Sequence, residues 1–124
     1  MIYLDTHVVV WLYAKELDRF SDVGLENIER NDLFVSPKVV LEIEYLRETG
    51  RITRGSRAIC DSLVETVGLR VCDKPFPSVV RAALEQTWTR DPFDRVIVGQ
   101  ARLADAFLLT KDNSIRKHYR KAFW

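Results

Sequence analysis

The regular alternation of short apolar runs with longer helical patterns constrains the fold more than any other feature of this sequence. The runs are IYL (2–4), LFV (33–35), LRV (69–71) and FLL (107–109). Each run is short and flanked by polar or turn residues, which is typical of buried strands. Strands that alternate with helices form right-handed βαβ units. The sequence therefore predicts an α/β fold with a central parallel sheet of four to five strands and helices on both faces.

Several helix ends are marked by residues with a physical preference for them. Ser36 is a predicted N-cap, and Pro37 occupies the first helical position of SPKVVLEIEYLRETG, which stops at Gly50. A second helical pattern, GSRAICDSLVETVG, also ends at a glycine, Gly68.

The composition is that of one compact domain, which we expect to span residues 1–124. The chain is 47% hydrophobic, enough for a core, and it has no linker-like stretch or internal repeat. The apolar N-terminal segment is interrupted by Asp5 and His7, and no apolar run approaches the length of a membrane span. We expect a cytoplasmic protein that does not contact membranes. Cys60 and Cys72 fit no metal-binding spacing and predict two buried thiols.

The net charge of +1 conceals an asymmetry along the chain. Residues 1–50 carry ten acids and five bases, whereas residues 51–90 carry seven bases and four acids, and residues 91–124 repeat that balance. The last stretch contains the basic residues Arg116, Lys117, Arg120 and Lys121. These residues would suit the backbone of a polyanion, or they would form a solvated final helix.

Two aspartates lie at the ends of predicted strands. Asp5 comes after the first apolar run, and Asp112 lies just past the last one. In parallel sheets the active crevice lies beyond the carboxyl ends of the strands. If the two strands are neighbours, both carboxylates point into that crevice. The competing interpretation is that each aspartate caps the helix that follows it.

Glu42 lies on the side of its predicted helix that faces the core. Val39, Ile43 and Leu46 form the apolar stripe, and Glu42 shares it, whereas Glu44 lies off the stripe and is expected to be solvated. A carboxylate beside core residues costs several kcal/mol unless it is paired or bound to a cation. A salt bridge is the alternative to a metal at this position.

The stretch RDPFDRVIVGQA contains two aspartates at the start of one helix. Asp91 is the predicted N-cap and Pro92 the first helical residue. Asp94, two residues further on, can complete the cap, and it also heads the inward row that contains Ile97 and Val98.

Four carboxylates in one pocket would repel one another and raise each other's pKa. Divalent cations with oxygen ligands, Mg²⁺ or Mn²⁺, make such a cluster tolerable, and one or two ions are expected. No set of histidines and cysteines competes for a softer metal. For His7 and His118, which are far apart in sequence, a surface or supporting role is predicted.

The segments LDTHVVVWL, SPKVVLEIEYL, DPFDRVIVGQA and FLLTKD, in that order and spacing, resemble the PIN-domain ribonucleases, in particular the VapC-like toxins of bacterial toxin–antitoxin pairs. The likeness spans nearly the whole chain and implies a PIN-like three-layer fold. It places the four acids of the family, as catalytic residues and metal ligands, on Asp5, Glu42, Asp94 and Asp112. Thr6 and Thr110 match hydroxyl residues that assist the site, and Arg95 matches an arginine with a structural pairing role. Thr89 departs from the pattern, because many relatives have a histidine there.

The resemblance also implies an activity and partners. The implied activity is cleavage of structured or looped RNA, of the transfer or ribosomal class, by a water that Mg²⁺ or Mn²⁺ activates. The implied partners are a cognate antitoxin and a second copy of the chain. Trp11 and Tyr13 are candidate surface for either interface, and the competing interpretation is that they pack in the core. Two alternatives remain open. One is a catalytically silent PIN-like module that binds RNA or protein. The other is aspartate-based phosphoryl transfer, which favours an acid where His7 stands.

Overall fold

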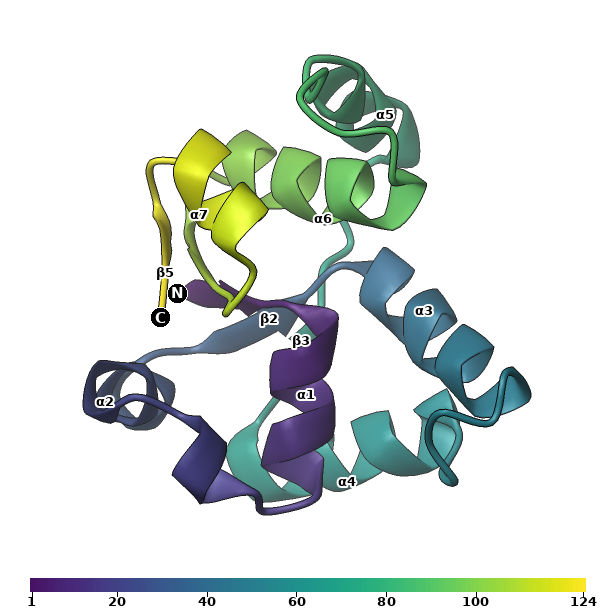
Figure 1. Cartoon of the computed structure of the whole chain (residues 1–124), viewed down its shortest axis with the longest axis vertical. Helices are drawn as coiled ribbons and strands as arrows, with labels where there is room; N and C mark the ends of the chain where they lie inside the picture. Colours follow the sequence, from purple (N-terminus) through teal and green to yellow (C-terminus); the bar gives the residue numbers. More distant parts are fainter.

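The computed structural model describes residues 1–124 and contains a five-stranded, all-parallel sheet with helices on both sides (Figure 1). The strands are β1 (Ile2–Leu4), β2 (Leu33–Val35), β3 (Arg70–Val71), β4 (Phe107–Leu109) and β5 (Ala122–Phe123). Their order across the sheet is β3-β2-β1-β4-β5. The predicted α/β class and the four predicted strands are confirmed. The fifth strand, at 122–123, lies in a segment whose charge pattern had suggested only a helix.

The helices form two layers around this sheet. They are α1 (Thr6–Tyr13), α2 (Asp22–Arg30), α3 (Pro37–Glu48), α4 (Ser56–Val67), α5 (Phe76–Leu84), α6 (Pro92–Leu103) and α7 (Asn113–His118), with a short 3₁₀ helix at Leu17–Arg19. Figure 1 shows α5, α6 and α7 on one side of the sheet and α1, α2 and α4 on the other. Helix α3 contacts α1, α4 and α6 and so joins the two layers. No helix has the length and apolar character needed to cross a membrane.

The predicted helix ends are present. The Ser36 hydroxyl accepts a hydrogen bond from the Lys38 amide at 3.1 Å, which starts α3. Gly50 and Gly68 adopt left-handed backbone conformations after α3 and α4, with φ of 77° and 68°, a region that favours glycine.

Glu44 corrects one sequence-based expectation. It is half-buried rather than solvated, and its Oε2 accepts hydrogen bonds from the Ser56 amide and hydroxyl at 2.9 and 3.2 Å. Helix α4 begins after Gly55, which has no side chain to cap it. Glu44 supplies the missing cap from the neighbouring helix, and it also pairs with Arg47.

The final helix is shorter than the charge pattern suggested. Helix α7 ends at His118, and the chain returns to the sheet as β5. Arg120 and Lys121 therefore lie between α7 and β5, so a helix over all four basic residues is wrong. Leu108 and Leu109 of β4 pair in parallel with β5, which gives this segment a structural role that its composition did not reveal.

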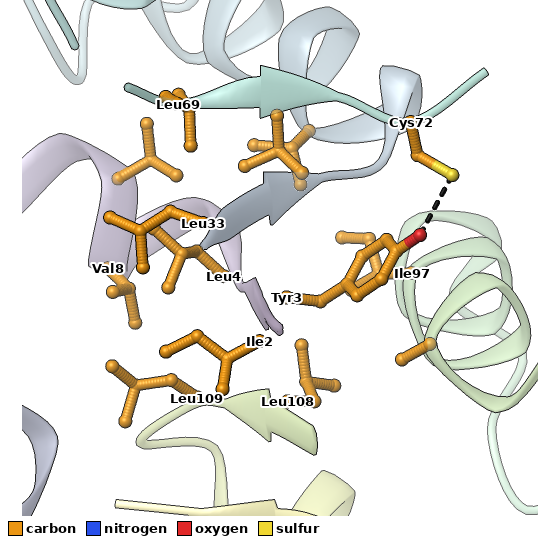
Figure 2. Close-up of a cluster of buried hydrophobic side chains, with 14 of the residues drawn as sticks. Ile2, Tyr3, Leu4, Val8, Leu33, Leu69, Cys72, Ile97, Leu108 and Leu109 are labelled. Carbon is orange, nitrogen blue, oxygen red and sulfur yellow. Dashed lines mark hydrogen bonds between the residues drawn. The ribbon is translucent and has the colours of Figure 1, made fainter. Parts of the chain in front are cut away.

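The core surrounds strands β1 and β4. All three residues of β1 are buried, as are Leu108 and Leu109 of β4 (Figure 2). Such continuous burial is typical of parallel strands covered on both faces. Cys60 and Cys72 are buried and free, as predicted. The Tyr3 hydroxyl donates a hydrogen bond to Cys72 Sγ at 2.8 Å, which satisfies the polar end of a buried ring (Figure 2).

Helices α5 and α6 pack against each other unusually closely at Gly99. A Cβ atom at this position would lie 2.7 Å from the Ala83 amide nitrogen, which is inside van der Waals contact. The glycine therefore allows close approach of two helix backbones, and it fixes the orientation of α6, which begins beside the candidate site.

Candidate active site

A pocket of about 390 Å³ opens at the carboxyl ends of β1 and β4. These strands are neighbours, with Leu4 opposite Leu109, and the chain order reverses between them, where parallel sheets place their ligands. All four predicted acids line this pocket: Asp5, Glu42, Asp94 and Asp112. They come from the end of β1, from α3, from the first turn of α6 and from the segment after β4. The predicted convergence of the four side chains is confirmed, and their catalytic and metal-binding roles stay predictions.

Asp5 is the most buried and most tightly held of the four acids. Only 5% of it is exposed. Its Oδ1 accepts a hydrogen bond from the Thr6 amide at 2.7 Å, and its Oδ2 accepts one from the Thr110 hydroxyl at 2.6 Å. Asp5 is also the N-cap of α1. Asp5 therefore both caps α1 and faces the pocket, and the capping hydrogen bond fixes the orientation of its carboxylate in the pocket.

Thr110 links Asp5 to Asp112. Its hydroxyl donates to Asp5 and accepts a hydrogen bond from the Asp112 amide at 3.1 Å. Asp112 in turn caps α7, since its Oδ1 accepts a hydrogen bond from the Ile115 amide at 2.9 Å. One oxygen of Asp112 serves the helix, which leaves the second for a ligand.

Glu42 contributes to the pocket from the inner face of α3. Its Oε2 accepts a hydrogen bond from the Thr6 hydroxyl at 2.6 Å. Glu42 forms no salt bridge, so the alternative of an ion pair at this position is wrong. Burial raises the pKa of the Glu42 carboxyl, and the hydrogen bond from Thr6 partly opposes that shift. Thr6 and Thr110 thus each orient one carboxylate.

Asp94 is the acid whose ionisation the fold disfavours most clearly. Asp91 caps α6, accepting hydrogen bonds from the Phe93 and Asp94 amides at 2.8 and 3.4 Å. The Asp94 carboxyl takes no part in the cap and faces the pocket. Burial, followed by the negative charge of Asp91 and then of the other three acids, raises the pKa of Asp94 to about 7.

Asp91 is a fifth acid at the pocket, and the sequence predicted only a helix cap at this position. It is exposed and lines the same pocket as Asp94. The available signal was its spacing, because residues three apart on a helix share a face. Because the N-cap already explained Asp91, its position in the pocket was not predicted.

His7 has the supporting role that the sequence predicted as one of two possibilities. Its Nε2 accepts a hydrogen bond from the Lys111 amide at 2.9 Å, and its Nδ1 lies 3.6 Å from Asp5 Oδ2. Because Nε2 accepts, the ring is neutral. Burial lowers the pKa of His7, against the opposing pull of nearby acids. His118 lies elsewhere, stacked on Trp88.

Arg95 faces away from the acids. Its Nε donates to the Ala83 carbonyl at 3.2 Å and its terminal nitrogen to the Leu84 carbonyl at 3.1 Å. These carbonyls end α5. The structural role predicted for Arg95 is therefore observed, although its partners are backbone oxygens and not a carboxylate.

The four predicted RNA-binding residues are split between two regions. Lys121 pairs with Asp105 at 2.7 Å. It precedes β5 and so lies at the amino ends of the strands, whereas the acids lie at their carboxyl ends. Arg120 is next to it in the chain. Arg116 and Lys117 lie on α7, which Asp112 caps, and Arg116 donates a hydrogen bond to the Asn113 side chain. None of the four basic residues lines the pocket, so their RNA-binding role stays a prediction.

The chemistry of the pocket suits a hard divalent cation. Glu42, Asp94 and Asp112 have no cationic side chain paired with them, and the ligand atoms are carboxylate oxygens, which Mg²⁺ and Mn²⁺ prefer. In the observed side-chain arrangement no three carboxylate, imidazole or thiol groups form a ligand set for one ion. Binding would therefore require side-chain rotation within the pocket.

Comparison with known proteins gives consistent results for sequence and fold. Residues 2–121 match the family model described as PIN domain. Ribonuclease VapC22 of Mycobacterium tuberculosis (strain ATCC 25618 / H37Rv) is 30% identical over 123 residues, which cover 94% of this chain and 91% of that protein.

Two solved structures share the fold at lower sequence identity. A chain of the crystal structure of VapBC2 from Rickettsia felis, bound to a DNA fragment from their promoter, has a TM-score of 0.67 and 20% identity, covering 94% of this chain and 92% of that one. A chain of FitAB bound to IR36 DNA fragment has a TM-score of 0.56 and 16% identity, covering 99% and 94%.

Proposed function

The chain belongs to the PIN-domain family, among the VapC-like ribonucleases, and we propose that it is a metal-dependent endoribonuclease acting as the toxin of a toxin–antitoxin pair. One observation carries the proposal. Carboxylates from four separate segments converge on one pocket, and three of them lack a cationic partner. Burial, followed by the charge of Asp91 and of the other three acids, raises the pKa of Asp94 to about 7, and a divalent cation would favour the ionised form again.

The residues that would hold the metal are Asp5, Glu42, Asp94 and Asp112. When bound, Mg²⁺ or Mn²⁺ lowers the pKa of a coordinated water and neutralises negative charge that develops on the leaving oxygen. The protein's own contribution is orientation. Thr110 holds Asp5 and the Asp112 backbone together, and Thr6 fixes one oxygen of Glu42. Such supporting hydrogen bonds restrict carboxylate rotation before a ligand arrives.

The proposed substrate is structured or looped RNA of the transfer or ribosomal class, cut to leave a 5′-phosphate and a 3′-hydroxyl. The pocket supplies no serine or cysteine as a nucleophile, and its only imidazole, His7, is engaged with the Lys111 amide. Attack by an activated water is the route that these residues support. The name of the relative, a ribonuclease, supports the choice of RNA.

We further propose two protein partners, a cognate antitoxin and a second copy of the chain. The likeness to VapBC2 and FitAB supports the first. The second is an expectation from the family. Co-expression with any short reading frame that overlaps or abuts this one, followed by size-exclusion chromatography of the purified protein, tests both.

A catalytically silent module is the alternative that the observed geometry disfavours. A protein that only binds RNA or another protein does not need four carboxylates in one pocket, because they would repel a polyanion. Nor does it need two buried threonine hydroxyls aimed at them.

The decisive experiment measures cleavage of labelled transfer and ribosomal RNA by the purified protein with Mn²⁺ or Mg²⁺. Cutting is expected with metal and lost in EDTA. Asp5→Asn and Asp94→Asn should abolish it while circular dichroism remains that of the folded protein. Asp61→Asn, an exposed acid of α4, is the matched control and should cut normally. Cleavage that persists in EDTA would refute the metal mechanism, and unfolding of both Asn variants would assign these acids a structural role.

A further inference from the structure

A cluster of aromatic and basic side chains lies beside the carboxylates and is not explained by metal binding. We call Trp11, Phe20, Lys111 and Trp124 the indole cluster. The ring centroids of Trp11 and Trp124 are 5.9 Å apart, and those of Phe20 and Trp124 are 5.4 Å apart. Trp11 also lines the acid pocket. The indole cluster therefore adjoins the pocket that the carboxylates line.

The sheet topology brings these residues together from distant parts of the sequence. Trp124 directly follows β5, and Lys111 lies two residues beyond β4, its neighbour in the sheet. Trp11 lies on α1, which starts at the end of β1, and its ring contacts His7 at a centroid distance of 4.9 Å. All of them thus gather at the carboxyl ends of three adjacent strands, where the acids also lie.

Lys111 is the cation of this cluster that no acid neutralises. It is exposed and forms no salt bridge. Its Nζ lies 5.8 Å from the ring centroids of both Trp11 and Trp124. Arg19 also lies over Trp11, at 5.1 Å, but it is paired with Glu16. The Lys111 ammonium near the two indoles can contact a phosphate without breaking an ion pair.

Core packing alone does not account for the two indoles. Phe20 is buried, whereas Trp11 and Trp124 are only half-buried and retain ring surface toward solvent. Half-exposed aromatic rings beside a free cation are the features with which proteins hold unpaired nucleotides, because every base has a face that stacks and every linkage a charge that attracts lysine.

We infer that the indole cluster is a subsite for one unpaired nucleotide next to the phosphate that is cut. Its base stacks on Trp124, Trp11 meets that base edge-on because the two indole planes are at 75°, and its phosphate contacts Lys111. This inference rests on the proposed function and deepens it, because a base inside a duplex cannot reach the indoles. The same arrangement places a positive charge at the rim of a pocket that otherwise repels RNA.

The test measures binding separately from cleavage. Fluorescence anisotropy of a short labelled single-stranded RNA gives Kd for the Asp94→Asn protein, used as the parent. Adding Trp124→Leu should raise Kd about 10-fold, as expected for loss of one stacked base, and Trp124→Phe should retain most of the affinity. Trp88→Leu removes a half-buried tryptophan that contacts His118, outside the indole cluster, and should leave Kd unchanged.

A single abasic nucleotide, moved along the RNA, identifies the base that stacks. At one position it should weaken binding to the parent and have no further effect in the Trp124→Leu protein. Lys111→Gln, a substitution at an exposed side chain, should lower the slope of log K against log salt by about 0.7. Equal Kd values for parent and Trp124→Leu, or an abasic penalty that persists without Trp124, would overturn the inference.

The two proposals fail in different ways. Wild-type protein that cuts RNA but binds it independently of Trp124 and Lys111 retains the proposed function and refutes the subsite. Protein that binds an unpaired nucleotide through these residues and never cuts retains the nucleotide-binding role of the indole cluster and refutes the nuclease. Thermal melts of each variant identify any loss of affinity that comes from unfolding.

Discussion

Replacing Asp94 by asparagine should stabilise the metal-free protein at high pH, although it removes a proposed catalytic residue. The fold raises the pKa of Asp94 from 3.8 to about 7. The folded protein therefore binds this proton more tightly than the unfolded chain does. The ionised form costs no stability below pH 3.8, and the cost grows as the pH rises toward 7. Asparagine has the same shape and no charge, so it escapes this cost.

The size of the effect follows from the two pKa values. Each tenfold change in a proton-binding constant corresponds to about 1.4 kcal/mol, so a rise from 3.8 to about 7 sets a ceiling of about 4 kcal/mol. Asp94 is only half-buried, and solvent screening reduces this ceiling to about 1–2 kcal/mol. The variant should therefore gain about 1–2 kcal/mol at about pH 8, and less than half of that at about pH 4.

Urea unfolding in EDTA at these two pH values measures the difference. Asp61→Asn, on the exposed side of α4 and outside the pocket, is the matched control for replacing an aspartate by its amide. Adding Mn²⁺ should reverse the order, because a ligand that binds only the folded state stabilises it, and the variant binds metal less well. An Asp94→Asn protein that is less stable at high pH, or a difference that does not vary with pH, would refute the electrostatic argument.

Three further substitutions test other parts of the structure. Gly99→Ala places a Cβ against the α5 backbone, so urea unfolding should show a loss of about 1–3 kcal/mol despite the better helix propensity of alanine. Thr110→Val removes the hydroxyl that holds Asp5, and cleavage assays should show about 10–100-fold lower activity, with Thr110→Ser close to wild type. Arg95→Met leaves the carbonyls at the end of α5 without their donor. It should lower the unfolding free energy by about 1–2 kcal/mol, while Mn²⁺ affinity measured by calorimetry stays the same.

Elements with strong local signals were predictable from the sequence. The strands at 2–4, 33–35 and 107–109 combine apolar runs with flanking turn residues, and they occur at the predicted positions. The start of α3 follows from Ser36 and Pro37 and was placed correctly. In these segments the local preference and the tertiary structure agree, so a local pattern was enough.

The features that were missed depend on contacts between distant segments. Strand β5 has only two residues, and it is a strand because β4 offers it an open edge. The pattern of α3 alone predicts that Glu44 is solvated, because its partner, Ser56, belongs to the next helix, α4. The neutral state of His7 likewise depends on the Lys111 amide, more than one hundred residues away. No local pattern carries such information.

The carboxylates were predictable for a different reason. Each acid had an adequate local explanation, as a cap or a salt bridge, and three residues at the pocket, Asp5, Asp91 and Asp112, do cap helices. In a parallel α/β sheet, however, a helix that follows a strand begins at the carboxyl edge, so a capping acid there already lies near the ligand crevice. Local and functional roles coincide because one geometry serves both. Glu42 and Asp94 distinguish the local role from the functional one, since neither caps a helix and both face the pocket from inward positions. These two acids, and not the caps, are therefore the stronger evidence for a metal site.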